Sequence, residues 1–370
     1  MAQHLTDSWF LRLMKRAFRN IAFLFVLFAT SAGLIEHVKA QSASQPSRAA
    51  QKDKPQTPKT PEAEIVRVDT DITNIFFTAT DKDRRYVTTI TQADLTVLED
   101  GKPQKLFAFQ RETDRPLSLA ILVDVSASQQ VTLPLEKTAA RRFVDSIVRS
   151  GKDEVAIISF TGDATIEQDL TSDLPRLRRA IDQVEVVFPP GYIGGGIVVS
   201  TPNSNNRVGS TAIWDAICAT SQDLLTPAAS QKRHAIILIT DGFDTSSYLR
   251  RAEAVQRALK ADAAIYAIGI GDSRNFDGVD KGSLRKVSEQ TGGRAYFPKS
   301  EADLHAAFTE IEQELRSQYL IAYSPENKNR DGSYRQVEIE VTNPELKKQK
   351  LHLNYRPGYF PTVTTPTASQ

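Results

Sequence analysis

The sequence predicts an α/β fold: a doubly wound, mainly parallel sheet with helices on both faces, joined to a small β domain built from its flanking segments. Two patterns indicate this. Within residues 117–316, short apolar runs alternate with stretches whose apolar residues recur at helical spacing, as in successive strand–helix units. Residues 64–116 and 317–360 instead show the two-residue alternation of strands that are exposed on one face.

The central region begins with an uninterrupted apolar run, LSLAILV at residues 117–123. Such a run is typical of a strand that is covered on both faces. Further strands are predicted at 155–160, 164–170 (an antiparallel edge), 234–240, 264–270 and 295–297. Helices are predicted between them, with Gly292-Gly293 as a helix stop and Ser300 as the cap of the last helix.

The flanking segments carry strand and turn signals. Asp-Gly at 100–101, between the apolar alternations of 95–97 and 106–109, predicts a hairpin. Near the other end, 337–341 and 351–355 alternate cleanly, as in a hairpin-based extension. A block of about 50 residues is too small to hold a large core by itself. We therefore expect the two segments to join into one small sheet domain.

Residues 1–40 have the features of a signal peptide. Four basic residues precede an apolar run at 21–34, and Val38-Lys39-Ala40 fits cleavage after Ala40. The run is shorter than the roughly 20 residues that a membrane span needs. We expect export to the periplasm or secretion, with anchoring to the envelope by an uncleaved segment as the alternative. Residues 41–63 are predicted to be a disordered linker, and 361–370 a disordered tail.

Composition argues against several classes of function. The net charge of +1 gives no field that would attract nucleic acid or an anionic membrane. The single cysteine, Cys218, allows no internal disulfide and is expected to be a small buried side chain within a helix. The sequence has no Gly-x-Ser-x-Gly motif and no phosphate-binding loop. We therefore expect neither an enzyme nor a small-molecule substrate.

Three oxygen-rich segments stand where predicted strands end or a helix begins. The carboxyl ends of parallel strands meet at one edge of a sheet, which is where ligands bind in this kind of fold. Carboxylate and hydroxyl oxygens, without imidazole or thiolate, suit Mg²⁺, Mn²⁺ or Ca²⁺ rather than zinc. A single Asp at such a place is often only a helix cap. Five oxygen donors at the expected edge predict a cation site: Asp124, Ser126, Ser128, Thr211 and Asp241.

Asp-x-Ser-x-Ser after an apolar strand, a Thr that opens a helix, and Thr-Asp-Gly at a strand end together resemble the metal-ion-dependent adhesion site of von Willebrand factor type A domains. The resemblance covers about residues 117–315, and LTVLEDGKP at 95–103 is similar to a segment of the bacterial exported proteins with this domain. It implies that Ser126 and Ser128 bind the metal directly and that Thr211 binds directly or through water. Asp124 and Asp241 would be close ligands or hold coordinated water.

The same resemblance implies an adhesion-type module that binds a partner protein through a divalent cation completed by the partner's Asp or Glu. A scaffold whose metal only stabilises the fold, and a metal-dependent hydrolase, are the alternatives. Ala127 stands where Gly is usual, without removing a ligand. The long stretch 185–210 is either a tolerated insertion or a binding surface. In that stretch, three side chains are expected to be exposed: Phe188, Tyr192 and Ile193. Three aspartates are expected to be loop residues rather than ligands: Asp244, Asp272 and Asp277.

Overall fold

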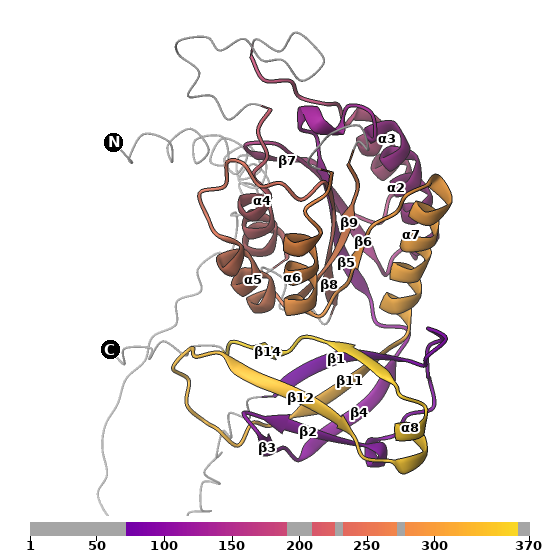
Figure 1. Ribbon diagram of the computed structural model, residues 1–370, viewed down its shortest axis with the longest axis vertical. Coiled ribbons are helices and arrows are strands. Elements are labelled where there is room, and N and C mark those ends of the chain that lie inside the picture. Colours follow the sequence, from indigo (N-terminus) through magenta and orange to yellow (C-terminus); the bar gives the residue numbers. More distant parts are fainter. Residues whose placement is uncertain (1–71, 191–208, 226–231, 272–277, 362–370) are drawn as a thin grey trace, which may run out of the picture. The chain divides into compact units, whose positions relative to one another are not determined.

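The computed structural model of the chain describes residues 72–190, 209–225, 232–271 and 278–361 (Figure 1). The expected signal peptide, linker and most of the stretch 185–210 lie outside these residues. So do Tyr192, Ile193, Asp272, Asp277 and the expected tail beyond residue 361. In the described ranges, no helix combines the length and apolar character that crossing a membrane requires.

A six-stranded sheet lies at the centre of the region from residue 117 to residue 316. Its strand order is β10-β9-β8-β5-β6-β7. The parallel strands are β5 (Leu117–Asp124), β6 (Glu154–Phe160), β8 (Arg233–Thr240), β9 (Ala263–Gly269) and β10 (Ala295–Tyr296); β7 (Ala164–Thr171) is the antiparallel edge. Every residue of β5 is buried, which explains why its sequence is apolar without interruption. The predicted fold class is confirmed.

Helices cover both faces of this sheet (Figure 1). One face carries α2 (Leu133–Ile147), α3 (Leu174–Gln183) and α7 (Glu301–Arg316); the other carries α4 (Ile213–Ala219), α5 (Arg251–Lys260) and α6 (Lys281–Thr291). Cys218 is buried against the second face. Helix α6 ends at Gly292 in the left-handed conformation, and Ser300 caps α7 by accepting a hydrogen bond from the Asp303 N–H.

The flanking segments form a β domain of two four-stranded sheets. The first contains, in order, β13 (His352–Tyr355), β1 (Thr73–Thr80), β11 (Gln318–Tyr323) and β4 (Leu106–Glu112). The second contains β14 (Gly358–Tyr359), β12 (Arg335–Val341), β2 (Leu95–Glu99) and β3 (Lys102–Pro103). Their inward side chains share one apolar core. Strands from both flanks therefore belong to one domain, as the fold-class prediction stated. The other short helices in the described ranges are η1 (Gln92–Asp94), η2 (Ala127–Gln129), η3 (Thr220–Leu225) and α8 (Pro344–Lys348).

Two expected pairings in the β domain are wrong. The turn at Asp100–Gly101 is present, but its second arm is only Lys102–Pro103, and β4 pairs with β11 in the other sheet. The expected hairpin of the C-terminal segment is also absent from the described residues, because β12 pairs with β2 and β13 pairs with β1. Two-residue alternation shows which face of a strand is buried, but it does not identify the strand beside it.

Asp153, in the turn before β6, connects three elements. It is 1% exposed and accepts hydrogen bonds from the Leu117 N–H at 2.8 Å and from the Arg149 and Arg316 guanidinium groups at 2.8 and 2.7 Å. Arg316, the last residue of α7, also donates to the Ile147 carbonyl at 2.6 Å. The carboxylate thus holds together the start of β5, the end of α2 and the end of α7.

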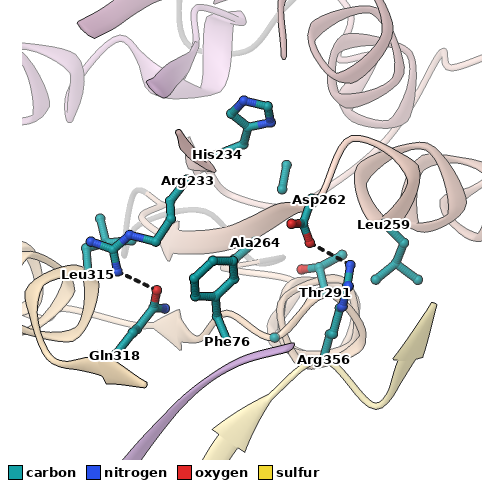
Figure 2. A pocket seen from close by; sticks show the side chains of 12 residues that line it. Phe76, Arg233, His234, Leu259, Asp262, Ala264, Thr291, Leu315, Gln318 and Arg356 are labelled. Atoms are coloured by element: carbon teal, nitrogen blue, oxygen red, sulfur yellow. Dashed lines mark hydrogen bonds and ion pairs between the residues drawn. The ribbon is translucent and has the colours of Figure 1, made fainter. Parts of the chain in front are cut away.

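A small cavity of about 40 Å³ lies at the amino ends of β8 and β9. Figure 2 shows Phe76 between Arg233 and Arg356 on its wall. Arg233 Nη1 donates to Gln318 Oε1 at 2.6 Å, and Arg356 Nη1 pairs with Asp262 Oδ1 at 2.6 Å. The volume suits a few water molecules. The cavity is at the end of the strands opposite to the predicted cation site.

Candidate metal site

Four of the five predicted donors lie together beyond the carboxyl ends of two neighbouring strands. Asp124 is the last residue of β5, and Asp241 directly follows β8. The two strands pair in parallel, with Val123 opposite Ile239, so both carboxyl groups reach the same edge. Ser126 caps the short helix η2, which contains Ser128. A tight turn after β5 therefore returns both serine hydroxyls to the strand end.

Hydrogen bonds hold this cluster in place. Asp124 Oδ1 accepts from the Ser126 N–H at 2.9 Å, and Asp124 Oδ2 accepts from Thr240 Oγ1 at 2.6 Å. The hydroxyl oxygens of Ser126 and Ser128 are 3.0 Å apart. Asp241 Oδ1 accepts from the N–H of residue 243 at 3.1 Å, and Ser128 also bonds to the Asp241 carboxylate. Two carboxylates and two hydroxyls thus form one network.

Thr211 lies at the same edge and is held by its backbone. Its carbonyl accepts from the Thr245 and Ser246 N–H groups at 2.8 and 3.0 Å, and its N–H donates to Thr245 Oγ1 at 2.9 Å. The next residue, Ala212, donates to the Thr161 carbonyl just after β6 at 2.7 Å. Thr211 is 5% exposed. Among the five described donors, it is the one not hydrogen-bonded to the others.

The surroundings of both carboxyl groups disfavour their ionisation. Burial raises the pKa of Asp124 to about 6, and the neighbouring Asp241 carboxylate contributes to the rise. Burial also raises the pKa of Asp241, although hydrogen bonds from Ser128 and the backbone offset part of this effect. A divalent ion beside both groups would replace repulsion with attraction. This electrostatic strain is the observation that fits a cation to the residues present.

The donor set also indicates which ions fit. No three His, Cys, Asp or Glu side chains converge as metal ligands anywhere in the described part of the chain. An ion at this edge would therefore depend on hydroxyl and water oxygens in addition to Asp124 and Asp241. Such a set of oxygen donors suits Mg²⁺, Mn²⁺ or Ca²⁺.

Sequence reasoning missed two residues that support this cluster. Gln129 is fully buried, and its Nε2 donates to Ser128 Oγ at 3.3 Å. Thr240 Oγ1 both donates to Asp124 and accepts from the Gly242 N–H at 3.1 Å. The Thr-Asp-Gly motif contained a signal for Thr240, because a hydroxyl at a strand end can orient the neighbouring carboxylate. The sequence around Gln129 contained no comparable signal.

Two further segments near the candidate site were partly predicted from the sequence. Asp244 is a loop residue, as expected, and its Oδ1 accepts from the Ile213 N–H at 2.8 Å at the start of α4. The Val187 N–H donates to the Val125 carbonyl at 2.8 Å, which fastens the beginning of the stretch 185–210 to the loop that carries Ser126. Phe188 follows with 39% exposure. The described part of this stretch therefore lies beside the candidate site.

The stability of the metal-free chain should fall as pH rises from about 4 to about 7. The folded pKa of Asp124, about 6, is above its ordinary value of 3.8, so the folded state retains a proton that the unfolded chain has released. The contribution is therefore largest in acid and is lost through this window, on the order of 3 kcal/mol in total. Urea unfolding in EDTA at pH 5, 6 and 7 measures it. The variant Asp124→Asn should show a smaller slope, and equal slopes would contradict the assignment.

The parallel sheet with helices on both faces, and an oxygen-rich cluster beyond two strand ends, define an α/β domain of the kind that binds a ligand at its carboxyl edge. Two sequence profiles, both described as von Willebrand factor type A domain, match residues 119–243 and 200–310. Together they span more than half of the chain. The chain therefore contains a von Willebrand factor type A domain, and domains of this family generally mediate protein–protein interactions.

Individual relatives are distant. An uncharacterised protein of Borreliella burgdorferi is 21% identical over 248 residues, which cover 64% of this chain; the match spans 65% of that relative's length. An aerotolerance-related membrane protein from Bacteroides fragilis is similar in structure, with 20% identity and a TM-score of 0.40 over 54% of this chain and 98% of its own. Proximal thread matrix protein 1 of the mussel byssus, with a zinc-occupied adhesion motif, has 17% identity and a TM-score of 0.44, covering 59% and 49%.

Proposed function

We propose that this chain is an exported module that binds a partner protein through a divalent cation and captures an Asp or Glu side chain of that partner. The observation that carries the proposal is the network of Asp124, Ser126, Ser128 and Asp241 at the edge of the sheet, with Thr211 beside it. Two carboxylates and a few hydroxyl oxygens leave coordination positions of a divalent ion open. A partner carboxylate would complete the coordination.

The surrounding residues have separate tasks in this proposal. Mg²⁺, or Mn²⁺ or Ca²⁺ in its place, would supply positive charge and an open coordination position. Ser126, Ser128 and Thr211 would provide neutral oxygens. Thr240 keeps Asp124 oriented by its 2.6 Å hydrogen bond, so that the carboxylate is held in place before an ion arrives. Export rests on the basic and apolar pattern of residues 1–40.

One alternative shares the same geometry. A scaffold whose metal only stabilises the fold would also benefit from relief of the repulsion between Asp124 and Asp241. It differs from the proposal in one respect: the ion would change the stability of the chain but not its affinity for a partner. Partner binding with and without the ion therefore separates the two functions.

Affinity capture from an envelope extract of the source organism tests the proposal. The purified native chain is immobilised in Mg²⁺ or in EDTA, beside Asp241→Ala in Mg²⁺. A matched control is Asp182→Asn, because Asp182 is an exposed aspartate on α3 that pairs with Arg141. We expect a partner protein that the native and control chains retain in Mg²⁺ and that EDTA releases. Retention should also require an acidic residue of that partner. Equal retention in all arms would contradict a cation-dependent capture.

A further inference from the structure

The cavity at the amino ends of β8 and β9 has a buried cationic side chain on its wall. Arg233, the first residue of β8, is 4% exposed, and its Nη1 donates to the Gln318 amide oxygen at 2.6 Å (Figure 2). Arg233 Nε and Nη2 have no hydrogen-bond partner among the described residues. Within those residues the guanidinium group is therefore bonded to one neutral acceptor and to no carboxylate. A buried charge in this state is costly.

The rest of the cavity wall provides no counter-ion for Arg233. Among the described residues that line the cavity, Asp262 is the one acidic side chain, and its Oδ1 pairs with Arg356 Nη1 at 2.6 Å. Figure 2 shows this pair on the opposite side of Phe76 from Arg233. Two guanidinium groups and one carboxylate leave the wall with an excess of positive charge.

The wider surroundings of Arg233 do not remove this excess. Burial lowers the pKa of Arg233 to about 10; Arg316 and Arg115 act in the same direction, whereas Tyr266 and Glu112 oppose it. With this pKa the guanidinium group is still charged near neutral pH. Helices α6 and α7 end at the cavity wall, and their carbonyl ends carry partial negative charge. These helix ends nevertheless give Arg233 Nε and Nη2 no acceptor.

The size and lining of the cavity limit the ligand that it can hold. A volume of about 40 Å³ accommodates a few water molecules. A chloride ion is only slightly larger than a water molecule, whereas a sugar or a nucleotide is far too large. Much of the wall is apolar, with Phe76, Leu259, Ala264 and Leu315. Apolar walls weaken dielectric screening, so they strengthen the attraction between a guanidinium group and an anion.

We propose that this cavity binds one small monovalent anion, of the size of chloride, against the Arg233 guanidinium group. The anion supplies the counter-charge that the wall lacks and an acceptor for N–H groups that have no partner. Arg233 begins β8 and Gln318 begins β11, so the bound anion stabilises the place where these two strands start. The cavity and the candidate metal site lie at opposite ends of the strands, and the inference does not depend on a bound cation.

Urea unfolding of the purified full chain, with sodium gluconate replaced stepwise by sodium chloride at constant ionic strength, tests the proposal. Gluconate is too large for the cavity, and EDTA in every sample keeps divalent ions from the candidate metal site. The equilibrium constant for folding should increase with chloride and follow a binding curve. At about one hundred times the Kd of chloride the increase should be about a hundredfold. Sodium bromide should give a similar increase.

Replacement of Arg233 by methionine removes the charge and keeps a side chain of similar length. In gluconate, Arg233→Met should be at least as stable as the native chain, because it no longer buries a charge without a counter-ion. Its stability should not respond to chloride. The matched control is Arg178→Met, which removes an exposed guanidinium group that pairs with Asp145 and should respond to chloride as the native chain does. Arg233→Gln takes the place of the methionine variant if that variant does not fold.

Chloride NMR measures binding to the native chain without reference to stability. The native chain should broaden the chloride resonance, and bromide should reverse this broadening by competing for the site. A folded Arg233 variant should broaden it less. Equal unfolding midpoints of the native chain in chloride and gluconate would overturn the inference. A chloride response of Arg233→Met equal to that of the native chain, or no broadening by the native chain, would overturn it as well.

Discussion

Replacement of Asp153 by asparagine should lower the free energy of unfolding by about 3 to 5 kcal/mol, the usual cost of removing one partner from a buried ion pair. The carboxylate accepts hydrogen bonds from Arg149 and Arg316 and from two backbone N–H groups, those of Leu117 and Arg149. Asparagine can accept some of these bonds but cannot neutralise two guanidinium groups. Urea unfolding at pH 7, followed by circular dichroism, measures the loss.

The pH dependence of the stability lost in Asp153→Asn provides an internal check. Burial alone would raise the pKa of Asp153, but the hydrogen bonds from Arg149 and Arg316 lower it well below its ordinary value of 3.8. A lowered pKa stabilises the folded state above about pH 4 and does so less as pH falls. The difference between native and Asp153→Asn chains should therefore shrink in acid. The control Asp145→Asn removes a partly exposed pair with Arg178 and should cost less than about 1 kcal/mol. A similar cost for both variants would contradict the account.

Replacement of Asp124 by asparagine should have opposite effects without and with Mg²⁺. Without the ion, the melting temperature should rise, because the variant removes a buried charge beside Asp241. For the native chain, Mg²⁺ at one hundred times its Kd should add about 2.7 kcal/mol of stability. For the variant it should add almost nothing, because a central ligand is lost. Thermal unfolding with Mg²⁺ or EDTA measures both effects, and an equal gain from Mg²⁺ in the two chains would contradict the site.

The sequence predicted the central domain because its pattern has one physical origin. A strand covered on both faces must be apolar throughout, and β5 is buried along its whole length. Apolar residues at helical spacing, and glycines at helix ends, predicted the helices between the strands. The β domain was predicted less completely. Leu106–Glu112 and Arg335–Val341 were recognised as strands, but their partners were not, because pairing depends on contacts between segments more than 200 residues apart.

The donors of the candidate site were recognisable because short polar residues directly follow apolar strands. The buried residues near these donors were not recognisable from the sequence. Gln129 resembles an ordinary turn residue, and its full burial results from packing beneath the loop. Glu136 has the spacing of a core position in α2, but a charged residue there predicts exposure by the usual rule. The three-dimensional structure shows that Gln129 donates to Ser128 and that Glu136 is buried on the core face of α2.

The most direct test of the central claim is isothermal titration of the purified chain with Mg²⁺, Mn²⁺ and Ca²⁺, beside the double variant Asp124→Ala, Asp241→Ala. Circular dichroism first establishes that the variant is folded. The account predicts a single saturable site in the native chain and none in the folded variant. Saturable binding of equal strength by both chains, or no binding by the native chain, would contradict a cation site at the carboxyl edge of this von Willebrand factor type A domain.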